Sequence, residues 1–181
     1  MTTPATLGLD RAGVDYRTHP YTHDPASGLS YGLEAAAALG VPPEMVFKTL
    51  VAEVDGLRAA RGLAVAVLPV TATLDLKALA QALGHKKAVM ADPAAAQRSS
   101  GYVTGGISPI GQRTALPAVV DSSAEQWERI YVSGGRRGFD ISLAPADLVR
   151  VTDARLISIA RTRSTRERSV RLDDLPPERC Q

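Results

Sequence analysis

Cysteine is nearly absent from this sequence, since the only one, Cys180, is the penultimate of 181 residues. A single cysteine excludes an internal disulfide and a cysteine-rich zinc site. Long apolar runs are missing too: no segment holds about 18 consecutive apolar residues, and residues 1–13 show no basic stretch followed by an apolar one. We therefore expect neither secretion nor a membrane span, and a reducing cytoplasm is compatible with this cysteine usage.

Strong charge and aromatic side chains are also scarce, with a net charge of +2 and 4% aromatic residues. Composition alone therefore indicates neither strong nucleic-acid affinity nor a base-stacking surface. The 45% hydrophobic and 22% charged residues are typical of a globular domain. Arginines gather near the end, at positions 161, 163, 166, 168 and 171. We expect a domain over residues 1–160 and a basic, flexible tail over residues 161–181, which either binds phosphates or is simply solvated.

Several catalytic motifs are missing. The chain contains neither of the glycine-rich nucleotide fingerprints, GxGxxG and GxxxxGK[ST], and no serine in a GxSxG elbow. His19, His23 and His85 do not have the spacing of a closed zinc site, which normally needs four ligands. We expect no metal and no cofactor, and no covalent intermediate on a side chain of the protein.

Helix and strand signals alternate along the chain. Thr3-Pro4 and Asp92-Pro93 each offer a helix cap followed by proline, and Gly40 ends an alanine-rich segment. Helices are therefore expected near residues 4–12, 30–40, 74–84, 92–101 and 145–149. Strands are expected over residues 14–19, 45–54, 63–70, 87–90, 116–121, 129–134, 139–143 and 156–160. This order predicts a mixed α/β fold.

Lys48 interrupts an otherwise apolar strand, MVFKTLV. A strand with apolar residues on both sides is usually covered on both faces, so this lysine must reach solvent or face a cavity. Two interpretations remain open: a lysine that extends to the surface, or a cation at the wall of a pocket that binds an anion.

Glycine is concentrated between Ser100 and Arg113, in SGYVTGGISPIGQR. Gly105-Gly106 permits positive φ and lets backbone N–H groups approach a ligand, as an oxyanion hole requires. A tight structural connection would use the same residues. A second cluster, VSGGRRGFDI over residues 132–141, adds two arginines and Asp140; it is either a phosphate or oxyanion site or a β-hairpin with a Gly-Gly turn.

Taken together, these motifs resemble the YbaK/EbsC family of aminoacyl-tRNA deacylases. The resemblance covers about residues 5–160 and rests on FKTL at 47–50, KKAVMAD at 86–92, AAQRSSGYVTGGISPIGQR at 95–113, YVSGGRRG at 131–138 and LAPADL at 143–148. It implies a largely antiparallel, barrel-like β-sheet surrounded by helices. It also implies trans-editing: prolyl-tRNA synthetase mischarges tRNA(Pro) with cysteine, and a separate enzyme cleaves the ester.

The same resemblance implies a set of site residues. The catalytic groups would be Lys48, Gly105 and Gly106, with the two glycine amides stabilising the oxyanion and the lysine holding the terminal ribose or phosphate. The substrate-binding residues would be Tyr21, Thr49, Ile107, Ser133 and Asp140. For this family a substrate-assisted route is proposed, in which the cysteinyl thiol attacks its own carbonyl and leaves as a cyclic thiolactone, so the reaction falls in the hydrolase or the lyase class.

Two other functions stay open on the sequence. One is a related deacylase acting on Ala-tRNA(Pro), and the other is a noncatalytic module that binds tRNA or the synthetase. The expected partners are Cys-tRNA(Pro) and prolyl-tRNA synthetase, and the sequence does not fix the oligomeric state.

Overall fold

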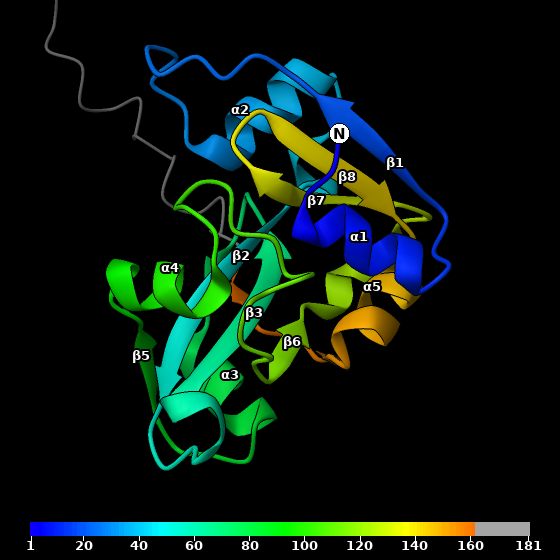
Figure 1. Ribbon diagram of the computed structural model, residues 1–181. Helices are drawn as coiled ribbons and strands as arrows, with labels where there is room; N and C mark the ends of the chain where they lie inside the picture. Colours follow the sequence, from blue (N-terminus) through cyan, green and yellow to red (C-terminus); the bar gives the residue numbers. More distant parts are fainter. Residues whose placement is uncertain (162–181) are drawn as a thin grey trace, which may run out of the picture.

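Helices and strands alternate through a computed structural model that describes residues 1–161 (Figure 1). The predicted tail, residues 161–181, therefore lies outside the described residues except for Arg161. The α-helices are α1 Pro4–Arg11, α2 Tyr31–Leu39, α3 Leu76–Ala82, α4 Pro93–Ser100 and α5 Pro145–Thr152. The strands are β1 Tyr16–Pro20, β2 Phe47–Val54, β3 Leu63–Pro69, β4 Thr73–Leu74, β5 Ala88–Met90, β6 Ala118–Val120, β7 Ile130–Arg136, β8 Phe139–Leu143, β9 Arg155–Leu156 and β10 Ala160–Arg161.

The predicted helix boundaries are confirmed where a cap signal was present. Thr3 caps α1 and shares a capping box with Thr6. The Asp92 carboxylate accepts from the Ala95 N–H at 3.0 Å and begins α4. Gly40, at φ 65°, ends α2 in the left-handed conformation. No helix in the described part of the chain is long and apolar enough to cross a membrane.

The strands form three sheets, with the orders β5-β2-β3-β6-β9, β1-β8-β7 and β10-β4. Five of the strand pairs are antiparallel, whereas β3-β6 and β6-β9 are parallel. The mixed α/β prediction is thus confirmed. The described strands do not close into a barrel, because β5 and β9 remain edges of the largest sheet.

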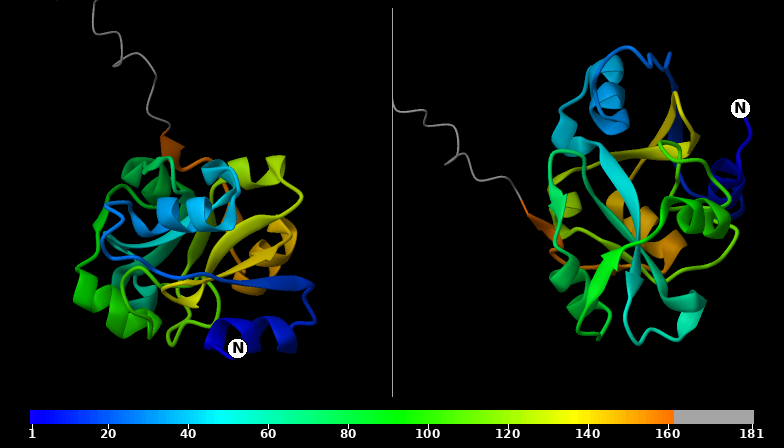
Figure 2. Two further views of the ribbon diagram at one scale, coloured as in Figure 1. Left: turned by 90° about the horizontal axis from the view of Figure 1, so that it is seen from above. Right: turned by 90° about the vertical axis from the view of Figure 1, so that its left-hand side faces the viewer.

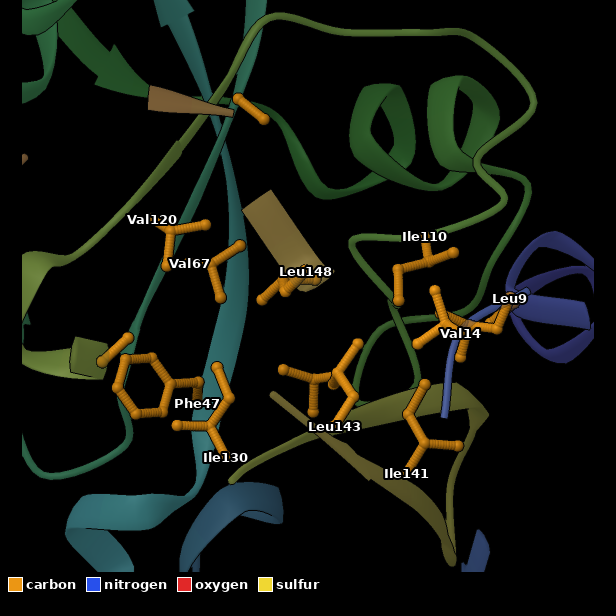
Figure 3. Packing of buried hydrophobic residues seen from close by; sticks show 14 of the residues in the cluster. Leu9, Val14, Phe47, Val67, Ile110, Val120, Ile130, Ile141, Leu143 and Leu148 are labelled. Atoms are coloured by element: carbon orange, nitrogen blue, oxygen red, sulfur yellow. The ribbon is translucent and has the colours of Figure 1, made fainter. Parts of the chain in front are cut away.

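The main core lies between the two larger sheets and helices α1 and α5. Figure 3 shows Phe47 of β2 close to Ile130 of β7, with Leu143 of β8 and Leu148 of α5 beside them. Burying each such side chain contributes about 1.5–3 kcal/mol relative to exposure. This packing holds β2 against the β7–β8 hairpin. Side chains on the opposite faces of these strands are therefore held in fixed positions relative to one another.

One predicted strand is wrong in its middle. The segment 156–160 was expected to be continuous, but it divides into β9 and β10. The Asp121 carboxylate accepts from the N–H of Ile159 at 2.7 Å and of Ala160 at 2.8 Å. These donors are satisfied by a side chain, so the chain bends here instead of continuing a ladder.

Candidate functional site

A pocket of about 350 Å³ lies between α2, β2, the loop after α4 and the β7–β8 hairpin. Figure 1 and the right-hand view of Figure 2 both show that loop rising from α4 toward α2. The pocket is bordered by seven of the eight residues marked by the sequence, namely Tyr21, Lys48, Thr49, Gly105, Ile107, Ser133 and Asp140. Gly106 does not border it.

Lys48 is partly buried and borders the pocket. Its neighbour Phe47 points into the core, so the alternation of β2 places Lys48 toward the pocket. Its Nζ donates to the carbonyls of Ala72 at 2.6 Å and Val70 at 3.4 Å. Burial lowers the pKa of the Lys48 ammonium. An ammonium carries three hydrogens, so one remains for a ligand in the pocket.

Asp140 is the most buried charged group of the pocket, with 5% of its surface exposed. It pairs with Ser133 of β7 and with His19 of β1, between core residues Phe139 and Ile141. Burial raises the pKa of Asp140 to about 7. A carboxyl group of this kind changes charge near neutral pH, which is common at functional sites.

Tyr21 follows β1 and borders the same pocket. Its N–H donates to the Gly138 carbonyl at 2.9 Å, which ties the segment to the β7–β8 hairpin. Burial first, and then the carboxylates of Asp140 and Glu34, raise the pKa of the Tyr21 hydroxyl to about 12. The hydroxyl is therefore protonated at neutral pH and can donate a hydrogen bond to a ligand.

Gly105 and Gly106 differ in what they do. Gly105 has φ +84°, and a Cβ there would lie 2.7 Å from the Tyr31 ring. Its N–H has no hydrogen-bond partner within residues 1–161. Gly106 donates its N–H to the Val103 carbonyl at 2.9 Å, and a Cβ there would lie 2.7 Å from the Cα of Arg136. The Gly106 amide is thus engaged within the loop, whereas the Gly105 amide is not, so Gly105 is the better placed of the two predicted oxyanion donors.

The loop that carries these glycines is held firmly at its base. The buried Tyr102 donates its hydroxyl to the Ile110 carbonyl at 2.8 Å. The N–H groups of Arg113 and Thr114 donate to the carbonyls of Ser100 and Ser99. These bonds close the loop on the end of α4, so the segment is an ordered wall and not a flexible linker.

Thr49 and Ile107 complete the wall with one polar and one apolar side chain. The Thr49 Oγ1 is buried and has no hydrogen-bond partner within the described residues. A buried hydroxyl without a partner is costly, so this atom is suited to a polar group of a bound ligand. Ile107 packs against the cluster of Val51, Leu63 and Ala96.

The second glycine cluster is a hairpin, but its turn is not at the glycine pair. Gly134-Gly135 lies within β7, at an irregularity in its pairing with β8, and the chain turns at Arg137-Gly138. A Cβ at Gly134 would lie 2.5 Å from the Phe139 ring. The glycine pair therefore permits close packing beneath the pocket.

Tyr31 and Met90 also border the pocket, although neither was predicted as a site residue. The Tyr31 ring lies between the Arg137 guanidinium, at 4.9 Å, and the His23 ring, at 5.4 Å. His23 in turn contacts the buried Glu34 carboxylate at 2.8 Å. The Arg137 contact joins Tyr31 to a segment far away in the chain, so no local pattern predicts it.

The pocket thus combines one cation, one carboxyl group that titrates near neutral pH, and one unpaired backbone amide. This arrangement can bind an ester and stabilise an oxyanion without supplying a nucleophile. No group of three or more His, Cys, Asp or Glu side chains within residues 1–161 is placed to hold a metal ion.

Comparisons with known proteins identify a family and a relative of this chain. A family model described as the aminoacyl-tRNA editing domain matches residues 30–151. EbsC of Enterococcus faecalis, whose name proposes it as a Cys-tRNA(Pro)/Cys-tRNA(Cys) deacylase, is 38% identical over 124 residues, which cover 68% of this chain and 73% of EbsC.

Two crystal structures share the fold. The hypothetical protein APE2540 superposes with a TM-score of 0.77 at 23% identity, over 88% of this chain and 100% of that one. A proposed trans-editing enzyme for prolyl-tRNA synthetase superposes with a TM-score of 0.72 at 21% identity, over 89% and 99% of the two chains.

Proposed function

The chain belongs to the family of aminoacyl-tRNA editing domains, in its YbaK/EbsC group, and from this premise we propose that it deacylates tRNA(Pro) mischarged with cysteine. The observation that carries the proposal is that Lys48, Gly105 and Asp140 border one pocket, although they come from three distant segments. The domain that does this work would be residues 1–160.

Charge stabilisation is the first task of the pocket. An aminoacyl ester is already activated, so holding it in place and stabilising the developing oxyanion can suffice. The unpaired Gly105 amide would donate to that oxygen. The remaining Lys48 hydrogen would donate to the terminal ribose oxygen as it leaves, while the carbonyls of Val70 and Ala72 hold the ammonium in position.

Substrate binding is the second task. The Asp140 carboxylate would pair with the aminoacyl ammonium, and the hydroxyls of Tyr21, Thr49 and Ser133 would bind neighbouring polar atoms. Because Asp140 has a pKa of about 7, its carboxylate predominates only above that pH. We therefore predict that KM for the aminoacyl ester falls as pH rises from 5.5 to about 7, a range in which α-amino groups, with a pKa of about 7.7–8.0, remain protonated. Steady-state deacylation measures this, and a KM independent of pH in this range would contradict the role of Asp140.

The thiol of the substrate would be the nucleophile. Its sulfur forms a bond to the ester carbonyl carbon, the bond from that carbon to the ribose oxygen breaks, and the thiol proton passes to the ribose oxygen. The products are a thiolactone and free tRNA. A side chain without a thiol cannot follow this route, which gives a selectivity that packing alone, at about 1–3 kcal/mol per methylene, does not reach.

The test compares tRNA(Pro) charged with cysteine, alanine, serine or proline, using the purified full chain. Fast release of cysteine alone, with thiolactone trapped among the products, is the expected result. Equal or faster release of alanine would identify an Ala-tRNA(Pro) deacylase instead, and tRNA binding without release of any amino acid would identify a noncatalytic module.

Matched lysine variants sharpen this test. Lys48→Ala is expected to lower kcat/KM by about 10²–10³-fold, the typical cost of losing one oxyanion-type donor. Lys77→Ala removes an exposed lysine on α3 that does not border the pocket, and should leave the rate unchanged. Equal deacylation rates for the two variants would show that Lys48 takes no part in catalysis.

Prolyl-tRNA synthetase is the proposed partner. The names of EbsC and of the structural relative support an editing role linked to tRNA(Pro) and to that synthetase. A faster deacylation of Cys-tRNA(Pro) on addition of the synthetase, and no such gain for an unrelated synthetase, is the expected outcome.

A further inference from the structure

Four exposed apolar side chains lie in or next to segments that border the pocket. Leu29, Tyr31, Met90 and Val103 are 49%, 38%, 46% and 52% exposed. Tyr31 and Met90 border the pocket, while Leu29 and Val103 adjoin its residues Ser30 and Thr104. We call these four residues the apolar collar. Surface apolar residues that occur singly need no explanation, whereas a group around a functional pocket indicates a binding surface.

The collar comes from three separate segments that meet only in the folded protein. Leu29 and Tyr31 flank the start of α2, Met90 ends β5, and Val103 lies in the loop after α4. Figure 1 shows that loop reaching from α4 toward α2. The collar is thus a product of the tertiary structure around the pocket.

A cation is fixed beside the collar. The Arg137 guanidinium lies over the Tyr31 ring at 4.9 Å, and its Nε donates to the Thr104 carbonyl at 3.0 Å. Both Arg136 and Arg137 are exposed at the turn of the β7–β8 hairpin. A planar aromatic and apolar surface with a held guanidinium is suited to a polymer of stacked bases and phosphates.

We infer that the apolar collar and Arg137 bind the unpaired nucleotides that precede the terminal adenosine of the aminoacylated tRNA. This inference rests on the proposed function, because an ester held in the pocket obliges the rest of the RNA to leave through its mouth. The pocket of about 350 Å³ lies near the lower end of the range of small-ligand sites, about 300–1,000 Å³, so the preceding nucleotides lie outside it. One base would stack on the Tyr31 ring, the aliphatic collar side chains would pack against the neighbouring nucleotides, and Arg137 would pair with a phosphate.

Substrate length separates the collar from the pocket. Steady-state kinetics would compare cysteinyl-tRNA(Pro) with 3′-O-cysteinyl-adenosine, which has the ester and terminal nucleoside but no preceding nucleotides. Leu29→Ser with Val103→Ser should raise KM for the tRNA by about 10-fold, as expected for losing the apolar contact of two half-exposed side chains, with kcat unchanged. KM for cysteinyl-adenosine should stay the same. Arg137→Gln should also reduce the dependence of tRNA binding on salt, by a slope of about 1.

The matched control is Leu7→Ser with Ile157→Ser, which alters two side chains that are 41% and 37% exposed and do not border the pocket. It should change neither KM. An equal loss on both substrates, or no loss on either while turnover persists, would overturn the collar. A loss seen only when the synthetase is present would overturn it as well, in favour of a protein surface.

A binding assay keeps the collar testable if catalysis fails. Should the unaltered chain turn over neither substrate, the proposed function falls, and fluorescence anisotropy with a short single-stranded RNA ending in CCA decides the collar alone. Weaker binding by the Leu29/Val103 variant than by the Leu7/Ile157 control supports it. Equal binding by the two variants overturns it.

Discussion

Two glycine pairs of this protein look alike in sequence and differ in the structure. Gly105-Gly106 lies in the loop after α4, and Gly134-Gly135 lies in β7. Of these four glycines, only Gly105 borders the pocket. Gly106 packs on the backbone at Arg136, and Gly134 packs on the Phe139 ring. One pair therefore brings a single amide to the site, whereas the other lets the hairpin pack closely beneath it.

The difference shows that the two segments contribute different kinds of group. The first brings backbone, through the unpaired Gly105 N–H. The second brings side chains, Ser133 and Asp140, which pair across the hairpin. Gly106 approaches the backbone at Arg136 and joins the two segments, so the spacing between amide and carboxyl depends on this close approach.

The largest effect is expected at Asp140. Its pKa rises from 3.8 to about 7 on folding, so folding favours its protonated form. Stability from this group is full below about pH 4 and is lost as pH rises through 7. Asp140→Asn does not titrate, so its gain over the unaltered protein should grow to as much as ~4 kcal/mol at pH 8, at about 1.4 kcal/mol per pKa unit, while deacylation falls.

Urea unfolding at pH 5, 6.5 and 8 measures this gain. Asp55→Asn, in the exposed turn after β2, is the matched control. If the stability gained by Asp140→Asn did not vary with pH, the buried carboxyl would not be the group that the hairpin contributes. The contrast between the two segments would then fail.

The next effect is expected at Gly105. An alanine there would push the Tyr31 ring and move the amide, and a displacement of about 1 Å at a reacting group can cost about 10²-fold in rate. Gly84 has nearly the same φ, +81° against +84°, with no atom within 4 Å of an added Cβ. Gly84→Ala should therefore incur the same backbone strain as Gly105→Ala, about 1–3 kcal/mol, without displacing a neighbouring ring, and should keep its deacylation rate.

Local signals predicted the elements of this fold well. Caps at Thr3 and Asp92, and the glycine at position 40, mark helix ends because they act within one turn of the chain. Segment 156–160 failed because the group that interrupts it, the Asp121 carboxylate, is 38 residues away from Ile159. Composition and order indicated the mixed fold, but the partition into three sheets depends on long-range pairing that periodicity does not report.

The site was predicted in outline for a different reason. The family motifs named Lys48, Gly105 and Asp140 as residues of one site, and all three border one pocket. Their spacing in the sequence alone would not have grouped them. The motif could not say which glycine has an unoccupied amide, since that depends on the bond from Gly106 to Val103. Tyr31 was missed because its contact with Arg137 comes from a distant segment of the chain.

The smallest of the three effects is expected at Gly106, where the two segments meet. Gly106→Ala places a Cβ 2.7 Å from the Cα of Arg136, and backbone cannot yield as a side-chain tip can. Overpacking of this kind costs about 1–3 kcal/mol. Gly8→Ala in α1 places its Cβ 3.2 Å from the Ile110 methyl group and gains helix propensity, so it should be neutral or stabilising. Thermal unfolding compares the two; if Gly106→Ala keeps full stability and loses only activity, the glycine acts at the site after all and the distinction between the two glycines fails.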